Sequence, residues 1–246
     1  MLRSLDDLRG YELSALDGDI GSIRDVYFDD TSWTVQYFVV DTGGWLSSRK
    51  VLISPAAVSG TPDDKKKKVS LLLTRESVKR SPDIDVDKPV SRRKEIEMMR
   101  HYRWPVYWQT PLPEAGAEVL PGYYEEVDIP EEEEGDRHLR SFKEVEGYNI
   151  HASDGDIGHV YDLIAEDKSW NIRYMAVDTG SWLPGRKVLI SPSWVDRVEW
   201  DTSRVYTGLV REHIQQSPRY DPGKPVDREY EKKLYDHYER LKYWSS

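Results

Sequence analysis

One stretch of this sequence occurs twice, in the same order and with the same spacing. The first copy consists of four blocks, at Asp17–Gly21, Trp33, Val40–Gly43 and Arg49–Pro55. The second copy has the matching blocks, each displaced by 137 residues (154 − 17, and 186 − 49), at Asp154–Gly158, Trp170, Val177–Gly180 and Arg186–Pro192. A constant displacement leaves no room for an insertion inside the unit. The pattern predicts a tandem duplication, so the fold has to be built from two copies of one unit.

The length of 246 residues suits two domains of ordinary size. We expect the first repeat and its helical tail at residues 1–108, an acidic linker rich in Pro and Glu at 109–138, and the second repeat and its tail at 139–246. Residues 109–136 of this linker carry 10 Asp and Glu and no Lys or Arg, so the remaining 35 acids balance the 35 bases of the whole chain. Neutral repeats are a poor match for nucleic acid or anionic lipid, and we expect neither direct nucleic-acid binding nor membrane insertion.

Within each copy, short apolar stretches separated by turn residues predict a meander of strands. In the first copy the expected strands lie at about 20–28, 34–41, 50–54 and 69–73. Asp17 and Gly18 predict a two-residue hairpin of type I′, in which both central residues have positive φ. Short antiparallel strands at this spacing close into small barrels, which removes the sheet edges. We therefore expect a mainly β fold (β+α) of two small barrels.

A helical tail is predicted after the strands of each copy. A short helix begins near Thr74 in copy one, and a longer helix follows, with Ser91 as its N-cap in copy one and Asp227 in copy two. The longer helix of copy two carries an apolar stripe that predicts a packed face, at Leu234, Tyr235, Tyr238 and Leu241. Each copy ends in Tyr-Trp, and we expect these aromatic ends to dock on the barrels.

The residue content excludes several kinds of site. There is no cysteine, so disulfides, thiolate metal sites and thiol nucleophiles are absent. The first residues have no apolar core that would make a signal peptide, and no run approaches the roughly 20 apolar residues of a membrane span. We expect a soluble protein of the cytoplasm.

The repeated blocks resemble the PRC-barrel family, named for the cytoplasmic domain of the photosynthetic reaction centre H subunit. That family also includes the C-terminal domain of the 16S rRNA maturation factor. The tails ending in Tyr-Trp are similar to extensions of stand-alone bacterial members. The resemblance implies a small β-barrel that docks proteins and is not a catalyst. It rests in copy one on Gly18, Ile20, Gly21, Ile23, Asp25, Val26, Val40, Asp41, Val51 and Pro55, and on their counterparts in copy two.

The function expected from these features is a non-catalytic interaction or scaffold protein without cofactor or metal. Its partner is an unidentified protein, and the two repeats pack on each other or the chain forms a homodimer. Two alternatives follow from the resemblance: a ribosome- or RNA-processing-associated factor, and a cytoplasmic cap on a reaction-centre or other membrane complex. The candidate docking residues are Trp45, Trp182, Arg49, Arg186, Tyr107, Trp108, Tyr243 and Trp244.

An aspartic hydrolase is a third alternative, because each copy contains Asp-Thr-Gly, at Asp41–Gly43 and Asp178–Gly180. Two carboxylates that share a proton can activate water for hydrolysis. Each triplet instead follows a short apolar strand and leads into a Gly-Trp or Ser-Trp turn. A turn at the end of a strand is therefore the preferred interpretation, and Asp41 and Asp178 remain the residues that a hydrolase would use.

Two metal-site hypotheses are weaker still. Asp17 and Asp19, like Asp154 and Asp156, offer hard oxygen ligands, but the further acids of a calcium loop do not follow them. His101 and its counterpart His237 recur on the tail helices without a partner four residues on. We interpret the aspartates as turn residues and the histidines as partly exposed helix residues.

Overall fold

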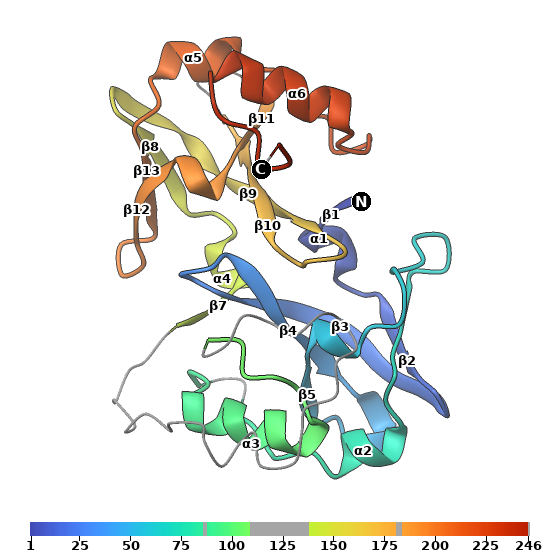
Figure 1. The fold of residues 1–246 in the computed structure, drawn as a ribbon. Coiled ribbons are helices and arrows are strands. Elements are labelled where there is room, and N and C mark those ends of the chain that lie inside the picture. The colour runs from blue at the N-terminus through green and yellow to red at the C-terminus, as the bar shows by residue number, and fades with distance from the viewer. Residues whose placement is uncertain (86–87, 109–137, 181–183, 246) are drawn as a thin grey trace. The chain divides into compact units, whose positions relative to one another are not determined.

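The computed structural model describes residues 1–85, 88–108, 138–180 and 184–245 (Figure 1). The expected linker therefore lies almost entirely outside the described residues. The described chain is mixed α/β, with 37% strand and 24% helix, so helices contribute more than a mainly β fold implies. The chain divides into two compact units, described separately below. Unit 1 consists of Met1–Leu8, Ser32–Val35 and Ser141–Ser246, and unit 2 of Arg9–Thr31 and Gln36–Arg140.

Unit 2 is built on a six-stranded sheet in which the strands follow the order β5-β4-β3-β2-β6, with β7 paired to β3. The predicted strand at 34–41 is confirmed as β4, and its residues from Val35 to Val40 are all buried. β2 and β6 run parallel, whereas β2–β3 and β4–β5 are antiparallel. The strands are β2 (Glu12–Ala15), β3 (Gly18–Asp29), β4 (Thr34–Asp41), β5 (Lys50–Ile53), β6 (Lys68–Ser70) and β7 (Leu139–Ser141).

Unit 1 has a seven-stranded sheet in the order β11-β10-β9-β8-β13-β12, with β1 paired to β9. Its elements follow those of copy one: β9, like β3, has 12 residues, and β11, like β5, has four. Buried Tyr174 occupies in this core the place of Tyr37 in the other. The strands are β1 (Leu2–Ser4), β8 (Asn149–Ala152), β9 (Gly155–Glu166), β10 (Ile172–Asp178), β11 (Lys187–Ile190), β12 (Val195–Glu199) and β13 (Arg204–Thr207).

The predicted closed barrels are not confirmed, because the pairing order of each sheet is open over the described residues. In unit 2 the chain leaves β5 through the 3₁₀ turn Pro55–Ala57. A proline has no N–H to donate to a strand ladder. Val58, which follows the turn, makes a single bridge to Leu71, which follows β6. The strands at the two ends of the sheet order are thus joined by a turn and a bridge, not by a continuous ladder.

The helices follow the predicted tails. The two N-caps are confirmed: Ser91 Oγ accepts from Lys94 N at 3.4 Å, and Asp227 Oδ1 accepts from Tyr230 N at 2.8 Å. Leu241 was expected on a packed face but is 97% exposed, because the helix ends before it. No described helix is long and apolar enough to cross a membrane. The helices are α1 (Leu5–Leu8), α2 (Arg75–Lys79), α3 (Arg92–Tyr102), α4 (Phe142–Val145), α5 (Arg211–Gln216) and α6 (Arg228–His237).

The predicted hairpin joins β2 to β3, but its turn lies one residue earlier than the type I′ prediction. Ala15 pairs with Gly18, so the two turn residues are Leu16 and Asp17. The positive φ falls on Gly18, at 142°, which already belongs to the strand. The type I′ assignment was therefore wrong, while the hairpin itself is confirmed.

The structure contains two three-residue strands that the sequence analysis did not predict. Each of them pairs with a strand of the other repeat. β1 precedes the strands of copy one in sequence, yet it pairs with β9 of copy two, with Arg3 opposite Ala165. β7 precedes the strands of copy two and pairs with β3 of copy one. Both strands have the sequence Leu-Arg-Ser. Figure 1 shows the first segment of the chain, in dark blue, against β9 within unit 1.

Candidate functional site

The repeated glycine of the first block marks a close contact between two strands. A Cβ added to Gly21 on β3 would lie 2.0 Å from the carbonyl oxygen of Asp41 at the end of β4, and the φ of Gly21 is 155°. In unit 1 a Cβ on Gly158 would lie 1.9 Å from the oxygen of Asp178. Real side chains do not tolerate such distances, so only glycine fits. The repeated Gly block and the repeated Asp-Thr-Gly block are therefore linked by a contact between the glycine and the backbone of the aspartate.

In unit 2 the Asp-Thr-Gly triplet forms a turn at the end of its strand. Gly43 N donates to Asp41 Oδ1 at 2.9 Å, and Thr42 Oγ1 donates to the carbonyl oxygen of Arg49 at 2.7 Å. The first bond is the backbone mimicry typical of an aspartate at a turn. The second joins the end of β4 to the residue that precedes β5. The preferred interpretation of the triplet as a strand-end turn describes this geometry.

The triplet of unit 1 makes the same two bonds, from Gly180 N to Asp178 Oδ1 at 2.8 Å and from Thr179 Oγ1 to Arg186 O at 2.8 Å. Lys187 Nζ also lies 2.9 Å from Asp178 Oδ2. The hydrogen bonds from Lys187 and Gly180 lower the pKa of Asp178 below its ordinary value. A catalytic proton-sharing pair needs a second carboxylate in contact with the first, whereas the groups that shift the pKa of Asp178 include no carboxylate. The surroundings of Asp178 therefore give the hydrolase alternative no support.

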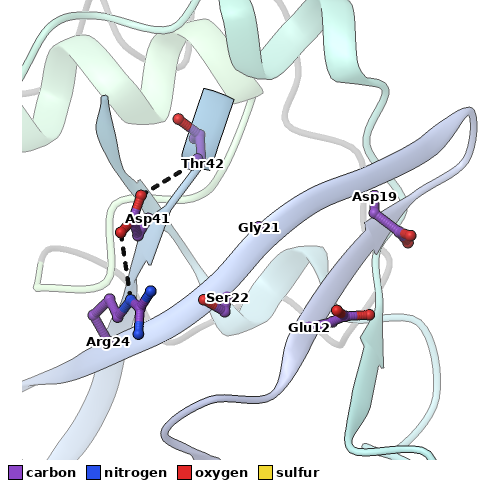
Figure 2. A pocket seen from close by; sticks show the side chains of 8 residues that line it. Glu12, Asp19, Gly21, Ser22, Arg24, Asp41 and Thr42 are labelled. Atoms are coloured by element: carbon purple, nitrogen blue, oxygen red, sulfur yellow. Dashed lines mark hydrogen bonds and ion pairs between the residues drawn. The ribbon is translucent and has the colours of Figure 1, made fainter. Parts of the chain in front are cut away.

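A small open pocket lies beside Gly21 in unit 2, with a volume of about 200 Å³. Figure 2 shows Glu12 and Asp19 on one side of Gly21 and the pair Arg24–Asp41 on the other. Arg24 Nε lies 3.4 Å from Asp41 Oδ2. The lining combines three carboxylates and one guanidinium and consists of Glu12, Asp19, Gly21, Ser22, Arg24, Asp41, Thr42 and Gly43.

Two of the three carboxylates of this pocket, Asp19 and Asp41, are bound to neighbouring groups. Asp19 accepts hydrogen bonds from Ser14 Oγ and, at 2.9 Å, from Lys68 Nζ. These two bonds, with Ser14 the larger contribution, lower the pKa of Asp19. The pocket is thus an exposed polar surface on which Asp19 and Asp41 are already paired with cationic side chains. Copy two does not reproduce it, because Asn149, His159 and Tyr161 stand where copy one has Glu12, Ser22 and Arg24.

The aspartate that opens each repeated block holds the start of a helix. Asp17 Oδ1 accepts from Arg75 N, the first residue of α2, at 2.7 Å. Asp154 Oδ1 accepts from Arg211 N, the first residue of α5, at 2.8 Å. A carboxylate at a helix N-terminus satisfies a free N–H and interacts favourably with the helix dipole. Both residues therefore have a structural role that does not involve calcium.

The repeated histidines join the two tail helices of each copy. His101 Nε2 lies 2.8 Å from Ser77 O, and His237 Nε2 lies 2.7 Å from His213 O. Within the described part of the chain, no three His, Cys, Asp or Glu side chains gather into a group that could hold a metal ion. The structure thus gives these histidines helix-to-helix contacts.

The Tyr-Trp end of copy one surrounds a buried carboxylate. Glu95 on α3 is fully buried and accepts from Tyr107 OH at 3.0 Å. His138, which directly precedes β7, binds the other oxygen of Glu95. The guanidinium of Arg92 lies 4.2 Å from the ring centre of Trp108, a cation–π distance. The two aromatic residues thus cover an ionic cluster inside unit 2.

The Tyr-Trp end of copy two has the same design and contacts the sheet, as predicted. Buried Glu231 accepts from Tyr243 OH at 2.8 Å and from Tyr174 OH, on β10, at 2.7 Å. Arg173, also on β10, lies over the ring of Tyr243 at 4.1 Å. Arg228 lies over Trp244 at 4.2 Å. The four aromatic docking candidates therefore have partners inside their own units, and a docking role for them stays a prediction.

Trp45 lies at the surface of unit 2 beside the β2–β3 hairpin. Its indole N–H donates to the carbonyl oxygen of Ile20, and Arg75 stacks over its ring at 4.4 Å. The indole is half-buried, so one part of the ring remains accessible. Its counterpart Trp182 lies outside the described residues. Docking through either tryptophan remains untested.

The two arginine candidates fasten the loop after the short helix of each copy. Arg49 Nη2 donates to Ser81 O at 2.9 Å and to Pro82 O at 2.6 Å. Arg186 Nη2 donates to Ser217 O. These bonds satisfy carbonyl groups beyond the helix ends. Both arginines are thus held in place within their units, and their predicted docking role is likewise untested.

Two exposed leucines were missed by sequence analysis. Leu16 is 70% exposed and Leu72 is 61% exposed. Leu16 N donates to the carbonyl oxygen of Leu73, so the backbone of Leu16 lies next to the segment that carries Leu72. We call Leu16, Leu72, Trp45 and Arg75 the hairpin face of unit 2.

The corresponding position in unit 1 has the same backbone and different side chains. Leu16 N donates to Leu73 O at 2.8 Å, and Ser153 N donates to Leu209 O at 2.9 Å. Ser153 and Gly208 stand where copy one has Leu16 and Leu72. The only sequence signal was this difference between otherwise matching copies.

Unit 1 carries a different surface feature on its outer strands. His151 on β8 stacks on Tyr206 of β13 with ring centres 5.1 Å apart, and Arg197 of β12 lies over the same ring at 3.8 Å. Copy one has Ser14 and Ser70 in the places of His151 and Tyr206. We call His151, Tyr206 and Arg197 the cation–aromatic ladder of unit 1.

These features define a small β-sheet domain with a helical tail, in which a glycine of one strand touches the backbone at the end of the next. Residues 2–70 match the family model of the PRC-barrel domain, from the first residue of β1 to the last residue of β6. The expected family is thereby confirmed, while a second PRC-barrel domain in copy two stays a prediction. None of the curated proteins compared with the chain matches it.

Proposed function

We propose that this chain is a non-catalytic docking protein whose two copies of one unit present different faces to protein partners. A PRC-barrel domain suggests an interaction module. The observation that carries the proposal is the hairpin face of unit 2. Two leucines that are more than half exposed lie there on neighbouring backbone segments, at positions where copy two has Ser and Gly. A contiguous apolar patch beside a half-buried tryptophan is typical of a protein-binding surface.

The partner that fits this face is a protein segment with an apolar side chain at its centre and an acidic group at its edge. The leucines and the indole of Trp45 supply the apolar area, and Arg75 supplies a cation at the rim. The cation–aromatic ladder of unit 1 is suited to a planar or acidic group. Two dissimilar faces on one chain can hold two partners near each other and raise their effective concentration.

The proposal includes a cytoplasmic location. Two alternative functions would also place the chain there. A ribosome- or RNA-processing-associated factor would co-sediment with ribosomal particles. A cap on a membrane complex would be recovered with the membrane fraction of the native host. Because the charges of the repeats balance, a protein is favoured over RNA as the surface that the chain binds.

The test is capture of partners from soluble and membrane fractions of the native host, with tagged full-length chain. The double variant Leu16→Ser/Leu72→Ser changes only exposed side chains, so its melting temperature should match that of the unaltered chain. We expect it to lose the main partner. Leu241→Ser is the matched control, because Leu241 is also exposed but lies elsewhere on the chain.

Alanine at Trp45 and Trp182 tests the sequence-predicted docking residues in the same assay. Retention of every partner by the double leucine variant, or an equal loss with Leu241→Ser, would refute the hairpin face as the docking surface. A partner lost only with the tryptophan variants would move the docking surface to those residues.

A further inference from the structure

The strand that begins the PRC-barrel match does not pair with the sheet of the repeat that it precedes in sequence. The match starts at residue 2, and β1 opens it, yet β1 belongs to unit 1, which is formed mainly by residues 141–246. The equivalent strand of copy two, β7, pairs with β3 in unit 2. Each sheet is thus completed by a Leu-Arg-Ser strand from the other half of the chain.

Matching ion pairs hold the two exchanged strands, the one in unit 1 buried and the one in unit 2 partly buried. Arg3 Nη2 lies 3.5 Å from Asp167 Oδ2 in unit 1, and Arg140 Nε lies 2.9 Å from Asp30 Oδ2 in unit 2. Arg140 and Asp167 follow Arg3 and Asp30 by the same 137 residues as the repeated blocks (140 − 3, and 167 − 30). The ion pair that holds β1 in unit 1 therefore has its counterpart in the ion pair that holds β7 in unit 2.

The backbone next to each ion pair is joined in the same way. Asp167 N donates to Met1 O at 3.0 Å, and Asp30 N donates to His138 O at 2.9 Å. These bonds extend the strand pairing by one residue at the same end of each exchanged strand. Main-chain bonds of this kind give strand addition its affinity, and side-chain pairs give it selectivity.

The first half of the chain gives unit 1 more than one strand. Leu5 and Leu8 of α1 are fully buried, and Asp6 N donates to Asp162 Oδ1 at 3.1 Å. The segment Ser32–Val35 also belongs to unit 1, where Thr34 Oγ1 lies 2.6 Å from Asn171 Oδ1. Unit 1 therefore includes buried side chains from residues that precede the first hairpin.

We propose that the two halves of this chain are binding partners for each other: one repeat is completed only by the Leu-Arg-Ser strand of a second repeat, and the connection through residues 109–137 is not needed to hold them together. Without the exchanged strands, Asp30 and Asp167 would each lose a buried cation, and β3 and β9 would each lose a paired neighbour. Leaving a buried charge without its partner is strongly unfavourable. Two reciprocal contacts also reinforce each other, because each keeps the other's donor strand close.

The test cuts the connection in the folded full-length chain. A site-specific protease sequence is placed after Gly116, and the purified protein is cleaved and examined by size exclusion with light scattering and by circular dichroism. We expect the two fragments to elute as one 1:1 complex with the spectrum of the uncut chain. Its melting temperature should rise with protein concentration, whereas that of the uncut chain should not.

Isosteric variants test whether the exchanged strands are responsible. In the cleaved protein, Asp30→Asn with Asp167→Asn should raise the dissociation constant of the fragments roughly 100-fold or more. Glu76→Gln, which alters an exposed ion pair with Arg80, should leave it unchanged. If the double variant does not fold even uncut, Asp30→Asn alone serves, because Asp30 is 17% exposed and its pair is less buried.

Three results would overturn the proposal. The first is separation of the cleaved halves into two folded species, which would show that one repeat completes itself. The second is unfolding or aggregation on cleavage, which would show that the connection is required. The third is an unchanged dissociation constant for the aspartate variants, which would place the association elsewhere.

Discussion

Arg3 and Asp167 form an ion pair across 164 residues of sequence, with side chains only 6% and 3% exposed. Arg3 arrives on a strand of three residues, and Asp167 directly follows the strand that receives it. A guanidinium and a carboxylate at this depth have given up most of their contact with water. Their mutual attraction and hydrogen bonds offset that loss only while both are present.

Asp167→Asn removes one charge from this pair and keeps the shape of the side chain. Because Arg3 is then left buried without its counterion, we expect the free energy of unfolding to fall by about 3 kcal/mol. Urea denaturation followed by circular dichroism measures the change. Glu76→Gln is the control, since its partner Arg80 is 73% exposed and exposed pairs contribute about 0–1 kcal/mol. Equal effects of the two variants would mean that the buried pair does not stabilise the strand exchange.

The glycine contact between strands gives a second prediction. Gly21→Ala would place a methyl group 2.0 Å from Asp41 O, at a φ of 155° that alanine rarely adopts. We expect a loss of more than about 3 kcal/mol in unfolding free energy, or failure to fold, because the obstacle is backbone that cannot rotate away. Gly44→Ala is the matched control: nothing lies within 4 Å of its added Cβ. A Gly21→Ala chain as stable as Gly44→Ala would refute the contact.

Local sequence signals predicted the elements whose partners are near in sequence. The strand at 34–41 and the N-caps Ser91 and Asp227 were correct, because an apolar run and a capping side chain act on their own neighbours. β1 was missed because Leu2–Ser4 is too short to show any period, and its partner strand is in the other half of the chain. The expected barrels stay unconfirmed over the described residues, because strand spacing does not fix whether the first and last strands meet.

Candidate site residues were harder to predict, since a side chain's neighbours decide its role. Trp45 and Arg49 look like exposed docking residues in the sequence, yet the first donates to Ile20 O and the second to Ser81 O. Leu16 has no distinguishing pattern, because single surface leucines are ordinary. The segment next to it is set by its hydrogen bond to Leu73 O, a residue 57 positions further along the chain (73 − 16).

The buried carboxylate at the end of copy two gives a third prediction. Tyr243→Phe removes one of two phenol hydroxyls that donate to Glu231, whose side chain is 3% exposed. A hydrogen bond to a charged acceptor contributes about 1.5–3 kcal/mol, so we expect a loss in that range on denaturation. Tyr230→Phe is the control, because Tyr230 OH donates at 3.1 Å to the neutral oxygen of Pro218 and should cost about 1 kcal/mol. A smaller loss for Tyr243→Phe than for Tyr230→Phe would contradict the role of Glu231 as the hydrogen-bonding centre of the cluster.

Asp162 links the exchanged N-terminal segment to the pH of the solution. The residue is 2% exposed, and one oxygen of its carboxyl group accepts from both Asp6 N and Leu163 N. Burial raises the pKa of Asp162 from 3.8 to about 7, and the nearby carboxylate of Asp6 adds to the rise. The folded chain therefore holds a proton that the unfolded chain has already released between about pH 4 and pH 7. The associated stability is fully present below pH 3.8 and is lost as the pH rises to about 7.

Asp162→Asn keeps the oxygen that accepts both backbone hydrogen bonds and cannot ionise. The rise in pKa corresponds to at most about 4 kcal/mol between the two ends of the range, so the variant should be more stable than the unaltered chain at pH 8 and similar to it at pH 4. Urea denaturation at a series of pH values measures the difference. Asp178→Asn is a control of opposite sign: the pKa of Asp178 is lowered, so its contribution is present at neutral pH and disappears as the pH falls. If the stability of Asp162→Asn depends on pH as the unaltered chain does, Asp162 is not the group that titrates when the exchanged segment binds.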